Sequence, residues 1–411
     1  MTVRVTDPDC EPMNTDTTSH NQPEALRAQL ADKLSREGTT RTARIEHAFR
    51  TVPRHMFLPG IPVQDAYTDQ IVITKRDNRG TPLVSASQPT VIAIMLEQLE
   101  AEPGHRVLEV GTGTGYHAAL LRELVGAHGE VTTIDIDPDA AEQARTRLAA
   151  AGYHDVHVVA GDGALGDKTR APFDRIIVTA GAWDLTPAWW EQLADDGRIV
   201  VPLRWRGLTR TTALDYRGDH LVSRSMTMCG FIPMQGGDGE RTLDLHDDVT
   251  IFYDEDQPID ANALRGVLDR PRHDCWSGVT VGGNDPFDGV WLRLSIAEPG
   301  TCRIVAQPSA VDSGRATPAI PKLNPAVAER GSLAYFTYRR LAGGEDRSEL
   351  GAIGHGPDGA ELADRIAEHI RTWDQDRTAV PTLAVFPAGT PDRFTTRTVI
   401  DKRHTRLTFS W

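Results

Sequence analysis

Short apolar runs alternate with amphipathic segments between Val107 and about Leu203. Runs such as VLEV, VTTI, VHVVA and DRIIVTA have the length of buried strands, whereas HAALLRELV and DAAEQARTRLAAAG carry apolar residues at helical spacing. The series ends with an expected helix over TPAWWEQLADDG and an expected strand over RIVVPL. Strands and helices that alternate in this way form a parallel sheet with helices on both faces. The pattern predicts a doubly wound, Rossmann-like α/β domain.

The chain before this alternating region divides into a polar arm and a helical segment. Residues 1–22 are rich in Asp, Thr, Asn and Pro and contain few apolar residues, which is typical of a disordered arm. The ordered domain is expected to begin at Pro23, because Leu26, Leu30 and Leu34 give the next segment one apolar helix face. Two further helices are expected, over Thr42–Thr51 and Gln88–Glu100.

The composition of the sequence changes after Gly237. Residues 238–411 are rich in Pro and Gly between strand-like runs, namely VTIFY, GVWLRLSI, TCRIV, SLAYFTYRRL and TLAVF. One amphipathic helix is expected near Asp358 to Trp373, with Asp358 as its cap. The sequence therefore predicts a first domain over 23–237 and a second α+β domain over 238–411.

The turn between the first expected strand and its helix carries three glycines at alternate positions, Gly111, Gly113 and Gly115. Glycine at these positions lets the backbone turn tightly and approach a ligand, with the amides at the helix start facing that ligand. The G-x-G-x-G spacing, preceded by Glu109, differs from the G-x-G-x-x-G typical of dinucleotide sites. The turn therefore favours S-adenosylmethionine over a dinucleotide.

Two further acids follow strand ends in the same order along the chain. Asp135 ends the next expected strand, about 20 residues beyond the glycines, where an acid can accept hydrogen bonds from ribose hydroxyls. Asp162 lies between Gly161 and Gly163 after a third strand, where it can accept from the exocyclic amine of adenine. With Glu109, these acids support a cofactor site at the carboxyl edge of the sheet.

Composition narrows the possible partners. The 411 residues carry 44 Lys and Arg against 58 Asp and Glu, which gives a formal net charge of −14. This negative charge argues against nucleic acid as a partner and is compatible with either simple solubility or a basic peptide partner.

No apolar run approaches the roughly 18 residues of a membrane span, and the polar start lacks the core of a signal peptide, so a cytoplasmic protein is expected. The four cysteines, Cys10, Cys229, Cys275 and Cys302, form no C-x-x-C pair, and no metal site is expected.

Several segments together resemble the protein-L-isoaspartate O-methyltransferase family. They appear in the family's order over about residues 25–237 and form a specific set: VPRHMFLP at 52–59, AYTD at 66–69, SASQP at 85–89, the glycine turn, GDG at 161–163, APFDRIIVTA at 171–180 and GFIPM at 230–234.

The resemblance implies an S-adenosyl-L-methionine-dependent carboxyl methyltransferase with S-adenosyl-L-homocysteine as product. It places Ser87 beside the reacting carboxylate, which is ionised at pH 7 and needs alignment with the methyl group and sulfur rather than a general base. The alternative role for Ser87 is to cap the helix that begins near Pro89. The expected cofactor-binding residues are Ser85, Glu109, Gly111, Thr112, Gly113, Gly115, Tyr116, Asp135, Ile136, Gly161, Asp162, Gly163 and Thr179.

Within the first domain, this chain departs from the family pattern in three places. Ser85 replaces the usual Thr and keeps a hydroxyl. His117 replaces Gln, and two roles stay open for it: a catalytic residue that binds the substrate carboxylate, or a packed histidine. The segment 69–84 is unusually charged, so its basic residues either meet an acidic peptide or form a solvated loop.

The largest departure is the second domain, since the family's repair enzymes are expected to end near Met234. The architecture resembles related enzymes that mature ribosomally made peptides, notably lanthipeptides and graspetides. The first hypothesis is therefore methylation of an Asp side chain in a modified precursor peptide, leading to an aspartimide that can open to isoaspartate. The alternatives are a general isoaspartate repair enzyme and a non-catalytic peptide-binding scaffold. The oligomeric state is left open.

Overall fold

The computed structural model describes residues 22–236, 239–342, 347–394 and 398–411. The expected arm lies outside these residues except for Gln22, which is the first residue of a helix. Along the described chain, no helix is both long and apolar enough to cross a membrane.

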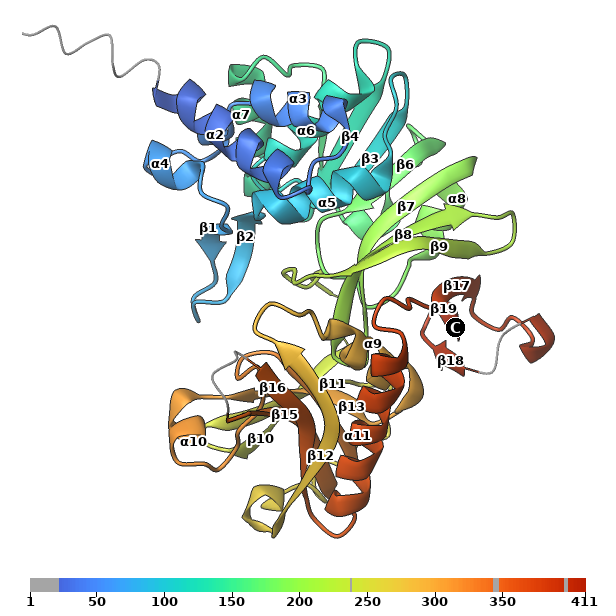
Figure 1. Ribbon diagram of the computed structural model, residues 1–411. Coiled ribbons are helices and arrows are strands. Elements are labelled where there is room, and N and C mark those ends of the chain that lie inside the picture. The colour runs from blue at the N-terminus through green and yellow to red at the C-terminus, as the bar shows by residue number, and fades with distance from the viewer. Residues whose placement is uncertain (1–21, 237–238, 343–346, 395–397) are drawn as a thin grey trace, which may run out of the picture.

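A ten-stranded sheet forms the centre of the first domain, in the order β18-β19-β17-β9-β8-β7-β6-β3-β4-β5 (Figure 1). Its parallel half consists of β3 (Arg106–Val110), β4 (Glu130–Asp135), β5 (His157–Ala160), β6 (Phe173–Val178) and β7 (Leu193–Trp205). Its antiparallel half consists of β8 (Leu208–Tyr216), β9 (Leu221–Met228), β17 (Thr382–Pro387), β18 (Thr398–Asp401) and β19 (Thr405–Ser410).

Helices cover both faces of the parallel half, as expected of a doubly wound domain. Val107 points into a core shared with the longer helices, and its neighbour Leu108 points into a second core that contains Trp189, because side chains alternate along a strand. The first core packs α2 (Gln22–Arg36), α3 (Ala43–Thr51), α5 (Pro89–Leu99), α6 (Tyr116–Val125) and α7 (Pro138–Ala150); the second packs the short α8 (Pro187–Gln192). Smaller elements of this domain are η1 (Arg54–Phe57), α4 (Val63–Ala66), η2 (Gly163–Leu165) and the hairpin of β1 (Val72–Arg76) and β2 (Pro82–Ala86).

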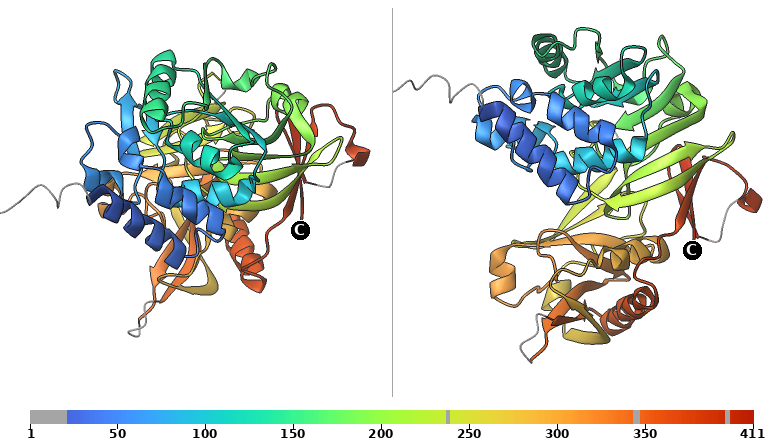
Figure 2. Two further views of the ribbon diagram at one scale, coloured as in Figure 1. Left: turned by 90° about the horizontal axis from the view of Figure 1, so that it is seen from above. Right: turned by 45° about the horizontal axis from the view of Figure 1, so that its top comes forward.

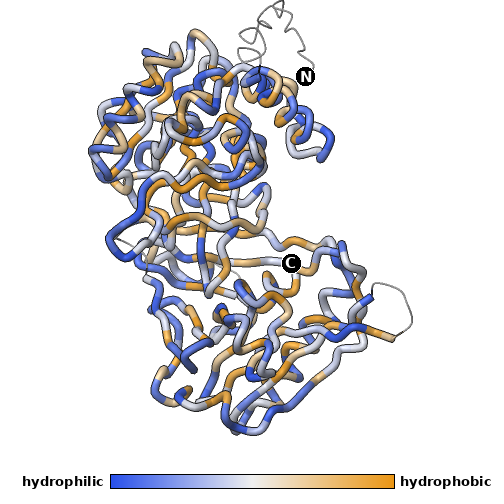
Figure 3. The backbone as a smooth tube through the Cα atoms, turned by 90° about the vertical axis from the view of Figure 1, so that its left-hand side faces the viewer, coloured by the Kyte–Doolittle hydropathy of each residue, from blue (hydrophilic) through white to orange (hydrophobic). Residues whose placement is uncertain are grey.

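The second domain is a seven-stranded antiparallel sheet in the order β10-β11-β13-β14-β15-β16-β12, with α11 packed against it. Its strands are β10 (Glu240–His246), β11 (Val249–Asp254), β12 (Arg272–Gly282), β13 (Thr301–Ala306), β14 (Asn324–Glu329), β15 (Ser332–Arg340) and β16 (Arg347–His355). Its helices are η3 (Val267–Asp269), α9 (Asp288–Ala297), α10 (Pro308–Asp312) and α11 (Gly359–Gln375), and η4 (Asp392–Phe394) follows β17. Figure 3 shows hydrophobic stretches of the chain within both domains.

Three local predictions were wrong. The run GVWLRLSI, expected to be a strand, is helix α9, because it is buried from two sides: Trp291 and Leu292 enter the core of the first domain, whereas Val290 and Leu294 enter that of the second. Such a run lacks the polar face that marks a helix. The helix over TPAWWEQLADDG ends at Gln192, where β7 takes over. Finally, the side chain of Asp358 does not cap α11.

The C-terminal strands depart from the expected domain boundary. Residues 238–411 were expected to form one unit, but Ala384 and Val385 of β17 pair with Val222 and Leu221 of β9. The last strands, red in Figure 2, therefore return to the first sheet, where β17 lies beside β9. Alternating apolar residues predict a strand but carry no information about which sheet edge it joins.

A buried carboxylate joins the two domains and the C-terminal strands. Asp254, at the end of β11, is fully buried and accepts hydrogen bonds from Arg204 Nε at 3.1 Å and from the Arg206 amide at 2.6 Å. The ammonium group of Lys402, between β18 and β19, lies 3.5 Å from the same carboxylate. Three distant parts of the chain thus share one buried charge.

Removing this carboxylate is expected to destabilise the protein strongly. Asp254→Ala leaves Arg204 and Lys402 buried without their shared anion, which should lower the free energy of unfolding by about 3–5 kcal/mol. Thermal unfolding followed by circular dichroism measures the effect. Asp219→Ala is the control, because the side chain of Asp219 is 84% exposed. Equal melting temperatures for the two variants would contradict the assigned role of Asp254.

Candidate functional site

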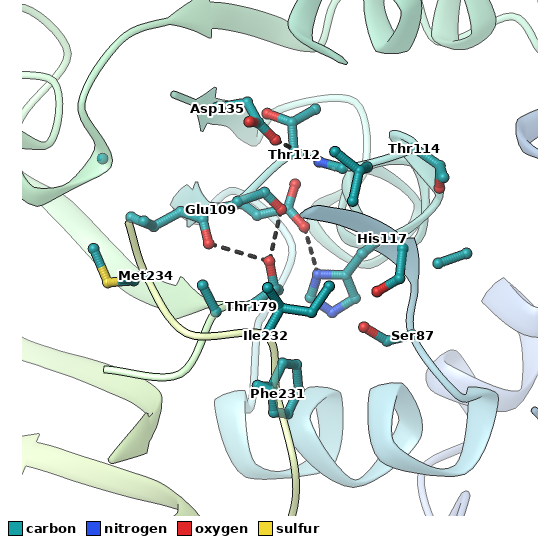
Figure 4. A pocket seen from close by; sticks show the side chains of 18 of the residues that line it. Ser87, Glu109, Thr112, Thr114, His117, Asp135, Thr179, Phe231, Ile232 and Met234 are labelled. Carbon is teal, nitrogen blue, oxygen red and sulfur yellow. Dashed lines mark hydrogen bonds and ion pairs between the residues drawn. The ribbon is translucent and has the colours of Figure 1, made fainter. Parts of the chain in front are cut away.

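An open cavity of about 290 Å³ lies at the carboxyl ends of β3, β4 and β6 (Figure 4). In open α/β sheets, ligands bind at this edge. The cavity wall includes Ser87, His117 and every predicted cofactor-binding residue except Gly115 and Gly161. Folding thus brings together predicted residues from five separate segments of the first domain.

The glycine turn is shaped by close backbone packing. Gly111 has a φ of 101°, and a Cβ there would lie 2.6 Å from Thr179 Oγ1. That hydroxyl donates to the Gly111 carbonyl at 2.6 Å, so Thr179, which follows β6, fixes the turn after β3. The wall of the cavity at this point is backbone, which leaves room for a ligand to approach closely.

Gly115 has a different role from the one predicted. It does not line the cavity; it precedes α6 with a φ of 88°, and a Cβ there would lie 3.3 Å from Ala144 and 3.3 Å from Leu148. The third glycine therefore allows α6 to start close against α7. Gly161 also lies outside the wall, where its amide donates to the Asp135 carbonyl at 2.9 Å.

Asp135 is held at the end of β4 by two backbone amides. Its Oδ2 accepts from Gly113 N at 2.8 Å and its Oδ1 from Asp137 N at 3.0 Å. Burial raises the pKa of Asp135, although these two bonds act in the opposite direction. Because each carboxylate oxygen can accept more than one hydrogen bond, Asp135 keeps acceptor capacity toward the cavity, as ribose hydroxyls would require.

Glu109 and His117 form a buried pair. Glu109 is fully buried; its Oε1 lies 2.7 Å from His117 Nδ1, and its Oε2 accepts from Thr133 Oγ1 at 2.6 Å. The glutamate, predicted to bind cofactor, therefore uses both oxygens to orient protein groups. Since Nδ1 donates to Glu109, Nε2 is the ring atom left to face a ligand. Nε2 is buried and has no hydrogen-bond partner within the described residues, and the ring lies between Glu109 and Ser87 (Figure 4).

Ser87 lies in the short connection from β2 to α5. The alternative that it caps α5 is wrong: the N-cap position is Gln88, whose side chain makes no capping bond, and the first-turn amide of Thr90 is bound by Asp69 Oδ1 at 2.9 Å. The serine therefore faces the cavity without the capping role.

The segment GFIPM closes another side of the cavity. Phe231, Ile232 and Met234 line it, and Gly181 holds the segment by donating to the Ile232 carbonyl at 2.8 Å and accepting from Met234 N at 2.9 Å. These residues belong to the GFIPM motif, but they were not predicted to form the site. Only the resemblance to the family motif could have indicated them, because they lie far from the glycine turn in the sequence.

The described cysteines do not line this cavity. The three described cysteines are free thiols, and burial raises the pKa of Cys229 and of Cys302 to about 12. No cluster of three or more metal-ligating His, Cys, Asp or Glu side chains occurs in the portion of the chain that is described.

The family model for protein-L-isoaspartate(D-aspartate) O-methyltransferases matches residues 25–239. The chain belongs to this family. It is accordingly an S-adenosyl-L-methionine-dependent carboxyl O-methyltransferase. The cavity fits that cofactor, because it combines the open glycine turn at Gly111 with a carboxylate at Asp135 that can accept further hydrogen bonds.

Curated relatives match the first domain. The protein-L-isoaspartate O-methyltransferase of Methanopyrus kandleri is 38% identical over 215 residues, which are 52% of this chain and 92% of the relative. Protein-L-isoaspartate O-methyltransferase 2 of Archaeoglobus fulgidus is 42% identical over 182 residues, 43% of this chain and 78% of the relative.

A solved structure named protein-L-isoaspartate O-methyltransferase matches the fold of nearly the whole chain. It is 21% identical with a TM-score of 0.51, and the match covers 94% of this chain and 100% of that one. A fold that continues past the first domain therefore also occurs in a protein with that name. The expectation that repair enzymes end near Met234 does not hold for every chain so named.

Loss of the Asp135 carboxylate is expected to weaken cofactor binding. Asp135→Ala removes the carboxylate that is predicted to accept hydrogen bonds from the ribose, so the binding free energy of S-adenosyl-L-methionine should weaken by about 1–3 kcal/mol. Titration calorimetry measures it, with Asp139→Ala as control because that side chain is 81% exposed.

The affinity for S-adenosyl-L-methionine is also expected to depend on pH. Because burial raises the pKa of Asp135, the carboxylate takes up a proton at a higher pH than an exposed aspartate does. Affinity should be full above that pKa and fall as the pH is lowered through it, and Asp135→Asn should lack this contribution. Wild-type affinity that stays constant down to about pH 4, the ordinary aspartate range, would contradict the assignment.

Proposed function

We propose that the protein methylates the side-chain carboxylate of an aspartate in a ribosomally made, modified precursor peptide. The observation that carries the carboxylate part of this proposal is the arrangement of Ser87 and the unpartnered Nε2 of His117 in one cavity with the cofactor-type turn. Two hydrogen-bonding groups beside the methyl-donor site suit an acceptor that must be oriented rather than deprotonated.

The residues of this chain would act by positioning. When bound, S-adenosyl-L-methionine supplies a methyl group on a positively charged sulfur, which an ionised carboxylate can attack without a general base. The Ser87 hydroxyl can donate to one carboxylate oxygen. His117, held through Nδ1 by Glu109, can donate from Nε2 when the ring carries both protons. Phe231 and Ile232 contribute apolar side chains to the wall of the same cavity.

The peptide part of the proposal is supported by what surrounds the cavity. Met234 and Gln235 line it, and β10, the first strand of the second domain, begins at Glu240. In this proposal, peptide residues beyond the methylated aspartate contact the second domain. The charged hairpin β1–β2 offers less positive charge to an acidic peptide than its sequence suggests, because Lys75 is paired with Asp137.

In this proposal, methylation prepares a second reaction of the peptide. The backbone nitrogen after the modified aspartate attacks the methyl ester, methanol leaves, and an aspartimide forms that can open to isoaspartate. General repair of L-isoaspartyl residues is the alternative, favoured by the names of the relatives and by the solved structure that shares the two-domain fold. Family membership makes the non-catalytic scaffold the weakest of the three hypotheses.

Substitutions at the two acceptor-side residues should affect turnover rather than cofactor binding. Ser87→Ala and His117→Leu are expected to lower kcat about 10-fold to 100-fold, the usual cost of misplacing a reacting group. His117→Gln keeps a side-chain donor and should retain more activity than His117→Leu. Steady-state kinetics and calorimetry with S-adenosyl-L-methionine measure the two effects; a loss of cofactor affinity in Ser87→Ala as large as in Asp135→Ala would show that the division of roles is wrong.

The identity of the substrate is tested by mass spectrometry. The enzyme and S-adenosyl-L-methionine are incubated separately with a linear isoaspartyl peptide and with a genomically neighbouring precursor peptide after its cyclisation. The proposal expects a gain of one methyl group followed by loss of methanol on the cyclised precursor.

The outcomes separate the hypotheses. Methylation of the linear isoaspartyl peptide alone would establish the repair function and reject the precursor proposal. The uncyclised precursor is the matched control, because it has the same aspartate without the constraint. Cofactor binding without methylation of any of the three peptides would favour the scaffold.

A further inference from the structure

The segment that carries Ser87 is held by charged side chains from outside it. Residues 85–90, here named the acceptor loop, run from the end of β2 into the first turn of α5. Ser85, Ser87 and Gln88 line the cavity. The Gln88 side chain makes no capping bond to α5, so the position of the loop depends on other parts of the chain.

Arg54 holds one side of the acceptor loop. Its side chain is fully buried; Nη2 donates to the Ser87 carbonyl at 3.0 Å and Nε donates to the Ala66 carbonyl at 2.9 Å. The guanidinium carbon lies 4.8 Å from the ring centroid of Tyr116, which also lines the cavity. A buried guanidinium is costly unless its hydrogen bonds and neighbours offset the loss of water. Here it ties η1, α4 and the cavity wall to the carbonyl of Ser87.

Asp69 holds the other side. Its Oδ1 accepts from Thr90 N at 2.9 Å, and its Oδ2 accepts from Thr90 Oγ1 at 2.7 Å and from Lys33 Nζ at 2.6 Å. Burial alone would raise the pKa of Asp69, but the bonds from Lys33 and Thr90 outweigh burial and lower it, so the group is ionised at neutral pH. An anion at this helix start also interacts favourably with the first-turn amides of α5.

We infer that Arg54 and Asp69 are positioning residues for methyl transfer, which set the place of Ser87 by holding the acceptor loop at Ser87 and at Thr90. Neither residue lines the cavity, so both act through the loop and not on the substrate. The inference rests on the proposed function in one respect, the assignment of Ser87 beside the acceptor carboxylate. It is independent of which peptide is methylated.

The inference is tested with Asp69→Ala, Asp69→Asn and Arg54→Lys, assayed on whichever of the peptides the wild-type enzyme methylates. Asp69→Ala removes both bonds to Thr90, and Arg54→Lys replaces the two nitrogens that bind the Ala66 and Ser87 carbonyls with a single one. Each should lower kcat about 10-fold to 100-fold, because small displacements of reacting groups have that effect. Cofactor affinity should stay within about twofold. Asp69→Asn keeps an acceptor for Thr90 and should retain kcat within about threefold of wild type.

A double-mutant cycle separates positioning from general stabilisation. If Arg54 acts through Ser87, Arg54→Lys should lower kcat by less than about threefold when Ser87 is already alanine, since coupled residues are not additive. Arg50→Lys is the matched control, because Arg50 forms its ion pairs with Asp32 and Glu46 on the surface of α2 and α3.

Three results would overturn the inference. These are additive losses in the cycle, equal kcat for Asp69→Ala and Asp69→Asn, and losses of kcat that match losses of folded protein or of cofactor affinity. If Arg54→Lys fails to fold, the two Asp69 variants decide the matter alone. Wild-type kcat in Ser87→Ala would instead refute the assignment of Ser87, which distinguishes failure of the proposed function from failure of the positioning role.

Discussion

The site depends on the hydrogen bonds made by the buried carboxylate of Glu109. Glu109 lies in the central strand β3 without exposed surface, and its carboxylate binds both Thr133 of β4 and His117 of α6. A carboxylate removed from water must have its oxygens satisfied, so these two partners are required by its burial. These bonds therefore fix the positions of β3, β4 and α6, the helix after the glycine turn, relative to one another. The same bonds leave one ring nitrogen of His117 directed to the cavity.

A similar logic joins the two domains. Asp254 binds groups from the first sheet, from the turn after β7 and from the C-terminal strands, and α9 places apolar side chains in the cores on both sides of it. The second domain is therefore attached by buried polar and apolar contacts rather than by a single linker.

The two sides of the cavity are built in different ways. On the cofactor side, Gly111 and Asp135 lie at the ends of adjacent parallel strands, where Thr179 and the Gly113 amide hold them. On the acceptor side, Ser87 belongs to a short connection whose place depends on Arg54 and Asp69, both distant in sequence. A general carboxyl methyltransferase and a peptide-specific one can share the first side. Differences in substrate would arise on the second side and in the adjoining domain.

The sequence by itself determined the doubly wound sheet, the glycine turn, the acids at strand ends and the match to family motifs, because each of these follows from local periodicity or from residue types at short spacing. It did not determine that Gly115 packs against α7, that Glu109 orients His117, or that Asp69 and not Ser87 binds the first turn of α5. Nor did it show that GVWLRLSI is a helix or that β17 joins β9. Only the tertiary structure decided these points, since each depends on which distant group occupies the space beside a residue, and apolar pattern and spacing describe a residue's own segment but not its neighbour.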